Sequence, residues 1–104
     1  MDTKLVIIKT HIDKDKVCIK IKDNAGGIKE DIINRIFEPY FTTKHKSKGT
    51  GIGLYMSQEI IVKHMNGSLE AKNSTFYYDN IKYSGALISI TLNINKLENN
   101  AYRE

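Results

Sequence analysis

Apolar and polar residues alternate along several stretches of the chain, which predicts strands. The first covers 4–12, and a polar turn over 13–16 separates it from the second. In the second strand Val17, Ile19 and Ile21 share one face, and continuing the count puts Asp23 on that same face. Strands over 68–78 and 81–84, joined by Asp79-Asn80, form a predicted hairpin. The last alternating strand covers 86–94.

Asp23 allows two interpretations. A carboxylate on the apolar face of a strand needs a polar partner, and no partner is evident in the sequence. Alternatively, Asp23 only caps the flexible turn that follows it over 24–27.

Two other stretches have the spacing of amphipathic helices. The first is a short helix over 29–37, which Pro39 prevents from continuing. The second begins after Gly53 and runs to about Asn66, where Gly67 supplies the stop. We expect it to cover a sheet, with His64 as a hydrogen-bonded structural histidine. The residues expected on its buried face are Leu54, Ser57, Ile61, His64 and Met65.

The composition indicates one small soluble domain. No apolar run approaches the length of a membrane span, and the single cysteine, Cys18, cannot form an internal disulfide, so we expect a cytoplasmic location. The net charge of +4 could suggest a nucleic-acid partner. However, all 16 basic residues except Arg35 and Arg103 are lysines, and most stand among acidic residues. A nucleic-acid binder is therefore the least favoured of the classes considered.

The main local concentration of positive charge precedes a glycine-rich turn, Gly49-Thr50-Gly51-Ile52-Gly53-Leu54. Taken alone this turn fits either a plain loop or a phosphate cradle, because a helix start offers unpaired N–H groups. The basic residues beside it favour the cradle and are Lys44, His45, Lys46 and Lys48.

Three boxes stand in a fixed order: DNAGGI at 23–28, FEPYFTTK at 37–44 and GTGIGL at 49–54. In type, order and spacing they resemble the ATP-binding catalytic domain of two-component sensor histidine kinases, one of the Bergerat-fold ATPases. The resemblance covers about 5–94. It implies an α/β two-layer sandwich with a mixed, mostly antiparallel sheet covered on one face by helices. Residues 1–95 would be part of that domain, truncated on its N-terminal side, and 96–104 a polar tail.

The resemblance also implies the site residues. Asp23 would read the adenine amino group, and Gly26 and Gly27 would make room for the base. Phe41, Thr43 and Lys44 belong to the phenylalanine box and the start of the ATP lid. The other expected lid residues are Thr42, His45, Ser47, Lys46 and Lys48. The second glycine box would close over the phosphates through Gly49, Thr50, Gly51, Gly53 and Leu54, the leucine by packing.

Two elements of the family pattern are absent. The helix that carries the magnesium-holding asparagine has no counterpart, and Asn24, Asn34 and Asn66 do not occupy its context. In the family's phosphoacceptor domain a histidine is followed by an acidic residue. No histidine of this chain is followed by one. The sequence therefore predicts neither a metal ligand nor a catalytic residue in this chain, and a fragment alone that is inactive and self-associates. The hairpin around Asp79-Asn80 is longer than is usual for the family.

The leading hypothesis is the ATP-binding part of a histidine kinase that uses ATP and Mg²⁺ and transfers the γ-phosphate to a histidine. Its partners would be the phosphoacceptor domain of the same kinase and a downstream response regulator. One alternative is another Bergerat-fold ATPase or a serine-directed anti-sigma kinase. The other is a non-catalytic module that senses nucleotide or docks a partner.

Overall fold

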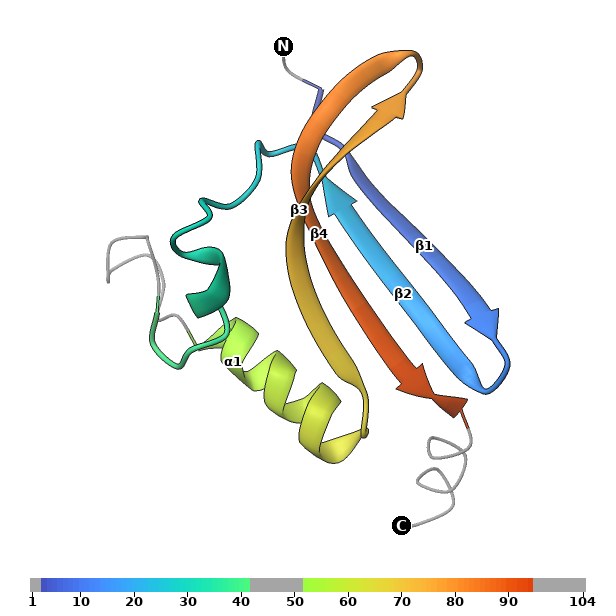
Figure 1. The fold of residues 1–104 in the computed structure, drawn as a ribbon, viewed down its shortest axis with the longest axis vertical. Coiled ribbons are helices and arrows are strands. Elements are labelled where there is room, and N and C mark those ends of the chain that lie inside the picture. Colours follow the sequence, from blue (N-terminus) through green and yellow to red (C-terminus); the bar gives the residue numbers. More distant parts are fainter. Residues whose placement is uncertain (1–2, 42–51, 95–104) are drawn as a thin grey trace.

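The computed structural model describes residues 3–41 and 52–94. Their strands form one antiparallel sheet in the order β1-β2-β4-β3. The strands are β1 (Val6–Asp13), β2 (Lys16–Asp23), β3 (Ser68–Tyr78) and β4 (Ile81–Asn93). In Figure 1 the helix lies beside β3, at the opposite edge of the sheet from β1. The predicted fold class is confirmed, and the strand pairs among the described residues are all antiparallel.

The register explains the alternation seen in the sequence. Ile19 pairs with Ile90, which also pairs with Leu69, so one face of three adjacent strands is apolar. The same face carries Ile21 and, two residues on, Asp23, as the sequence predicts. A methyl group on Gly67 would contact both Leu92 of this face and Ile61 of the helix. The helix therefore packs on the apolar face.

The opposite face holds a second, smaller apolar cluster. Tyr83 and Leu87 are buried there, and the Tyr83 ring lies 5.9 Å from that of Phe76. The Lys22 ammonium lies 5.6 Å from the centre of the Phe76 ring. Figure 1 shows β3 and β4 curving together toward their shared turn. This curvature gives the hairpin a small core of its own.

The hairpin turn and the last strand differ in how well the sequence predicts them. Asp79 and Asn80 have φ of 50° and 64°, the left-handed geometry that a two-residue hairpin turn requires, as expected. The separate strands predicted over 81–84 and 86–94 are wrong, because β4 is continuous through Gly85. Pairing with β3 carries the ladder across the glycine, because Ser74 pairs with Gly85, whereas the pairing with β2 ends at Leu87.

The helix predicted over 29–37 is also wrong. Only the 3-10 turn η1 (Ile33–Arg35) forms, and no side chain caps it. β-Branched isoleucines have modest helix propensity, and a short helix has to overcome the unfavourable nucleation of its first turn. Hydrogen bonds that reach three residues back, such as Arg35 N–H to the Ile32 carbonyl at 2.8 Å, hold the segment instead.

The second helix forms where predicted, but its buried face is different. It starts as α1 (Gly53–Gln58) and continues as a π-helical stretch, η3 (Glu59–His64). In η3 the hydrogen bonds reach five residues back, which breaks the 3.6-residue period, and contacts with β3 run through this second half. Leu54, Ser57 and His64 are therefore exposed, while Ile61 and Met65 are half-buried as expected.

Two further observations concern the helix surface. The His64 side chain is exposed and not on the buried face, and it forms no hydrogen bond with another described residue, so its structural role stays a prediction. On the solvent side the Lys63 ammonium lies 3.0 Å from a Glu59 carboxylate oxygen, and this hydrogen-bonded partner raises the pKa of Lys63.

In 3–41 and 52–94 no helix is both long and apolar enough to cross a membrane.

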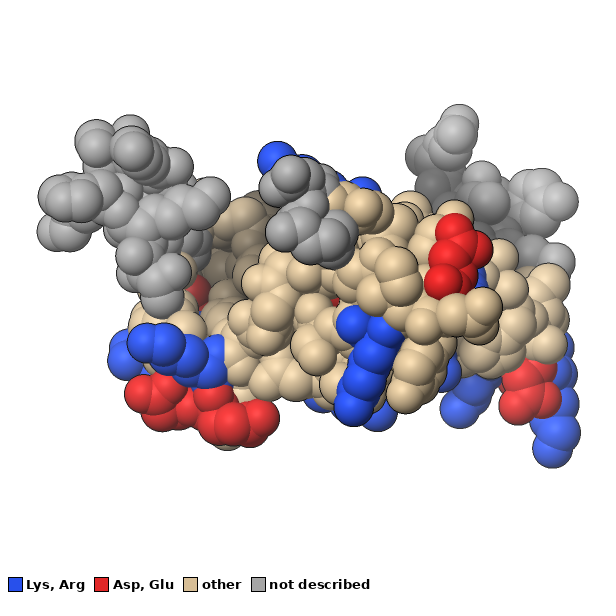
Figure 2. Space-filling model, turned by 90° about the horizontal axis from the view of Figure 1, so that it is seen from above, with Lys and Arg blue, Asp and Glu red and all other residues tan. Residues whose placement is uncertain are grey.

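The molecule is thin, measuring 47 × 38 × 21 Å, and among the described residues the buried apolar side chains are only Leu69, Tyr83 and Leu87. Seen from above in Figure 2, uncharged surface fills the middle of the view, and charged side chains lie mainly along its lower edge. On the apolar face, Val6, Ile8 and Ile12 of β1 are 67%, 63% and 70% exposed. Among the described elements, the helix thus covers only the β3 side of this face.

Candidate functional site

Asp23 ends β2, and its carboxylate is held by two backbone groups. Its Oδ1 accepts hydrogen bonds from the N–H of Ala25 at 3.0 Å and from the N–H of Ala86 at 3.1 Å. The first bond caps the turn, and the second joins β2 to β4 beyond the last ladder pair. The turn-capping bond that the sequence suggests does form, and the Ala86 N–H is a second partner that was not evident from the sequence. Its other oxygen, Oδ2, accepts no hydrogen bond within the described residues.

Gly85 permits this arrangement. A Cβ at this position would collide with the backbone carbonyl of Asp23 and would lie 2.5 Å from its Oδ1. Only glycine lets β4 approach the end of β2 so closely. The sequence carried a signal for this role, because an isolated glycine inside a strand pattern often marks a close backbone approach.

The two glycines of the first box make room for different neighbours. Both have positive φ, 95° for Gly26 and 96° for Gly27, which favours glycine at each position. A Cβ on Gly26 would face open space, whereas a Cβ on Gly27 would lie 2.7 Å from Oδ1 of Asn73. Of the two glycines, Gly26 is thus the one with open space at the position of a side chain.

The turn is also fastened to the hairpin. The Gly26 N–H donates to the Ser84 carbonyl at 3.1 Å. Asn73 of β3 forms two 2.7 Å hydrogen bonds with the backbone of Ile28, accepting from its N–H and donating to its carbonyl. The sequence gives no indication of this role for Asn73, because it depends on which residue of β3 lies opposite the turn.

Asn24 has a structural role at the other side of the turn. Its Oδ1 accepts from the Leu5 N–H at 3.0 Å, and its Nδ2 donates to the Thr3 carbonyl at 2.8 Å. These bonds tie the segment before β1 to the end of β2. Across 3–41 and 52–94, no three His, Cys, Asp or Glu side chains form a group that could hold a metal ion.

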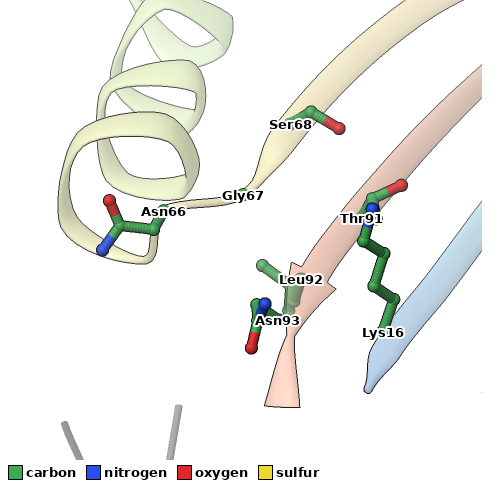
Figure 3. Close-up of a pocket in the computed structure, with 7 residues that line it drawn as sticks. All are labelled: Lys16, Asn66, Gly67, Ser68, Thr91, Leu92 and Asn93. Carbon is green, nitrogen blue, oxygen red and sulfur yellow. The ribbon is translucent and has the colours of Figure 1, made fainter. Parts of the chain in front are cut away.

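Two shallow hollows lie at opposite ends of the sheet. The first, of about 350 Å³, borders the Asp23 end of β2, and its lining residues are Gly26, Asn73, Ser74, Thr75, Ser84 and Gly85. The second, of about 320 Å³, lies at the Lys16 end (Figure 3). Figure 3 shows that its residues come from the end of the helix and from the strand ends. The first hollow is the one that adjoins the predicted adenine site.

The remaining site residues are placed only in part. Phe41 is half-buried, with the Arg35 guanidinium 4.5 Å from its ring centre. Gly53 starts α1, and Leu54 is 43% exposed, with no described contact to Asp23. In Figure 1 the segment over 24–41 leads from the Asp23 end of β2 to the side of β3 where α1 lies. The predicted residues outside the described ranges are Thr42, Thr43, Lys44, His45, Lys46, Ser47, Lys48, Gly49, Thr50 and Gly51.

Comparison with known proteins agrees with this geometry. Residues 2–96 match the model of the family described as histidine kinase-, DNA gyrase B- and HSP90-like ATPase. The chain belongs to this family. Two relatives are the two-component sensor PprA of Pseudomonas aeruginosa, 51% identical over 55 residues, and sporulation kinase E of Bacillus subtilis, 41% identical over 70 residues. These matches cover 53% and 64% of the chain but only 6% and 9% of the two relatives.

The structural likeness of this HATPase-family chain is to a histidine kinase catalytic domain. The catalytic domain of histidine kinase ThkA has a TM-score of 0.66 and 24% identity. The match covers 88% of this chain and 55% of that one. At this identity the likeness is one of fold.

Proposed function

We propose that this chain is the ATP-binding part of a sensor histidine kinase. In the intact protein it would hold ATP so that a histidine nitrogen of the phosphoacceptor domain attacks the γ-phosphorus. A nitrogen–phosphorus bond forms, the bond from the γ-phosphorus to the bridging oxygen breaks, and ADP leaves. A response regulator would then receive the phosphoryl group.

The arrangement of the Asp23 carboxylate carries this proposal. Two backbone N–H groups fix Oδ1, so the half-buried carboxylate is held in one orientation before a ligand arrives. Oδ2 remains as an acceptor for the adenine amino group. A fixed acceptor favours binding because little side-chain freedom is lost when the ligand binds.

Gly26 and the hollow beside it support the same assignment. The position that a Gly26 side chain would fill is open, and the hollow of about 350 Å³ starts there. In our proposal the base lies against this backbone, and Gly27 contributes by admitting Asn73 rather than by touching the base. Thr43, Lys44, Lys46, Lys48 and Thr50 are proposed to close over the phosphates, together with N–H groups around Gly51 and Gly53.

Residues 1–95 would be the later part of the catalytic domain, and the upstream part would supply the asparagine that holds Mg²⁺. This chain and that upstream part together would form the complete domain. When bound, the ion would neutralise phosphate charge. We also propose a cytoplasmic location for the domain, where ATP is available.

The first test compares nucleotide binding by the 104-residue chain and by the full-length kinase. We expect weak or undetectable ATP binding by the chain, because it has the adenine and phosphate boxes without the magnesium ligand. The full-length kinase should bind Mg-ATP and form an acid-labile phosphohistidine. Calorimetry and ³²P transfer measure the two steps. Tight, magnesium-dependent binding by the chain alone would refute the placement of the metal site, and binding without transfer would indicate a nucleotide-sensing module.

The second test concerns self-association of the chain. Val6, Ile8 and Ile12 lie exposed on the apolar face of an edge strand, and such surfaces tend to find partners. We expect light scattering to show dimers or larger species. Replacing Ile8 and Ile12 by glutamate should shift the chain toward a monomer, whereas Lys9→Glu, on the other face, should not. A wild-type monomer at high concentration with a cooperative melt would contradict this prediction.

A further inference from the structure

Asn73 connects the hairpin to the glycine turn through both ends of its amide. Oδ1 accepts from the Ile28 N–H and Nδ2 donates to the Ile28 carbonyl, each at 2.7 Å, and Nδ2 also lies 3.2 Å from a Glu30 carboxylate oxygen. The side chain thus pairs with one residue as a neighbouring strand would. Two backbone groups in an irregular segment obtain partners in this way.

Gly27 shows how closely this contact is fitted. With φ of 96°, and with Oδ1 of Asn73 only 2.7 Å from the position of a Cβ, the turn accommodates Asn73 because residue 27 has no side chain. The Gly26 N–H bond to the Ser84 carbonyl fastens the same turn to the other strand of the hairpin. The turn is therefore held from both β3 and β4, directly beside Asp23.

We infer that Asn73 is a positioning residue for the nucleotide site. By fixing Ile28 it sets the path of Gly26 and Gly27, and so keeps open the space that we assign to the base. This inference rests on the proposed function. A purely structural alternative is that Asn73 only stabilises the segment over 28–41, in which case its loss lowers stability without changing nucleotide affinity.

The experiment uses the full-length kinase with Asn73→Ala and Asn73→Asp, the second of which places a carboxylate oxygen against the Ile28 carbonyl and the Glu30 carboxylate. Aspartate can still accept from the Ile28 N–H but cannot donate to the Ile28 carbonyl. Lys72→Ala is the matched control, because Lys72 is the adjacent exposed residue of β3 and lies on the opposite face, paired with Leu87. Amide hydrogen exchange over 26–28 reports the turn without nucleotide, and initial rates give KM for ATP and kcat for autophosphorylation.

With Asn73→Ala we expect the amide hydrogen of Ile28 to exchange roughly tenfold faster. This factor corresponds to the loss of about one hydrogen bond. KM for ATP should rise by a similar factor while kcat changes less than about twofold, since the phosphate end and the acceptor histidine are untouched. Asn73→Asp should raise KM for ATP at least as much, because its carboxylate would be repelled by the Ile28 carbonyl and by the Glu30 carboxylate. Lys72→Ala should leave exchange, KM and kcat as in the wild type.

Two results would overturn the inference. One is unchanged exchange at Ile28 in folded Asn73→Ala. The other is faster exchange with an unaltered KM, which would assign Asn73 to stability alone. Failure of the proposed function would look different, because the wild-type kinase would then bind no ATP while exchange at Ile28 still responded to Asn73.

Discussion

Replacing Asp23 by alanine in the full-length kinase is expected to lower ATP affinity about ten- to hundredfold. The adenine amino group would lose its carboxylate acceptor, and a hydrogen bond to a charged group contributes roughly 1.5–3 kcal/mol. At about 1.4 kcal/mol per factor of ten, this gives the stated range. Alanine also removes the acceptor for the Ala25 and Ala86 N–H groups, so a melt has to accompany the binding measurement.

Asp23→Asn separates the adenine contact from the structural bonds. The asparagine Oδ1 can keep both backbone hydrogen bonds, while its NH₂ group replaces the free carboxylate oxygen. Guanine has an acceptor oxygen where adenine has its amino group, so the preference for ATP over GTP should narrow. Competition against a fluorescent nucleotide measures the affinities for ATP and GTP of the wild type, Asp23→Ala and Asp23→Asn. An unchanged ATP-to-GTP ratio in Asp23→Asn, or full ATP affinity in folded Asp23→Ala, would leave Asp23 as a turn cap only.

The strands could be predicted because alternation has a period of two and each strand has one apolar face. Val17, Ile19 and Ile21 therefore gave both the strand and the side on which Asp23 lies. The helix face could not be predicted as well, because the change to π-helical hydrogen bonding at Glu59 depends on packing. Leu54 was expected to be buried on the basis of a regular period that the helix does not keep.

The contacts around Asp23 show a different limit of sequence analysis. Asp23 and Gly26 could be identified from their box, because they are close in sequence and serve one turn. Asn73 and Gly85 act across the sheet, and their neighbours depend on the register between β2, β3 and β4. No local pattern specifies that Asn73 lies opposite Ile28 or that Gly85 lies against Asp23.

Gly85→Ala is expected to destabilise the complete domain strongly. The added methyl group would collide with the Asp23 carbonyl, which is backbone and cannot rotate away. β4 would have to move from the end of β2, and the hydrogen bond from the Ala86 N–H to Asp23 would be lost. Overpacking of this kind, together with a broken hydrogen bond, lowers the free energy of unfolding by about 2–4 kcal/mol. Urea denaturation followed by circular dichroism measures this difference.

Gly53→Ala is the matched control, because it adds the same methyl group where no described atom outside the neighbouring helix backbone lies within 4 Å. Gly53 is the first residue of α1, where alanine should change stability by less than about 1 kcal/mol and in the favourable direction. The comparison separates the collision at Gly85 from the general effect of replacing a glycine. Equal stability of the two variants would mean that β4 can withdraw from Asp23 without loss. In that case the close approach of these strands would not be what holds the carboxylate in place.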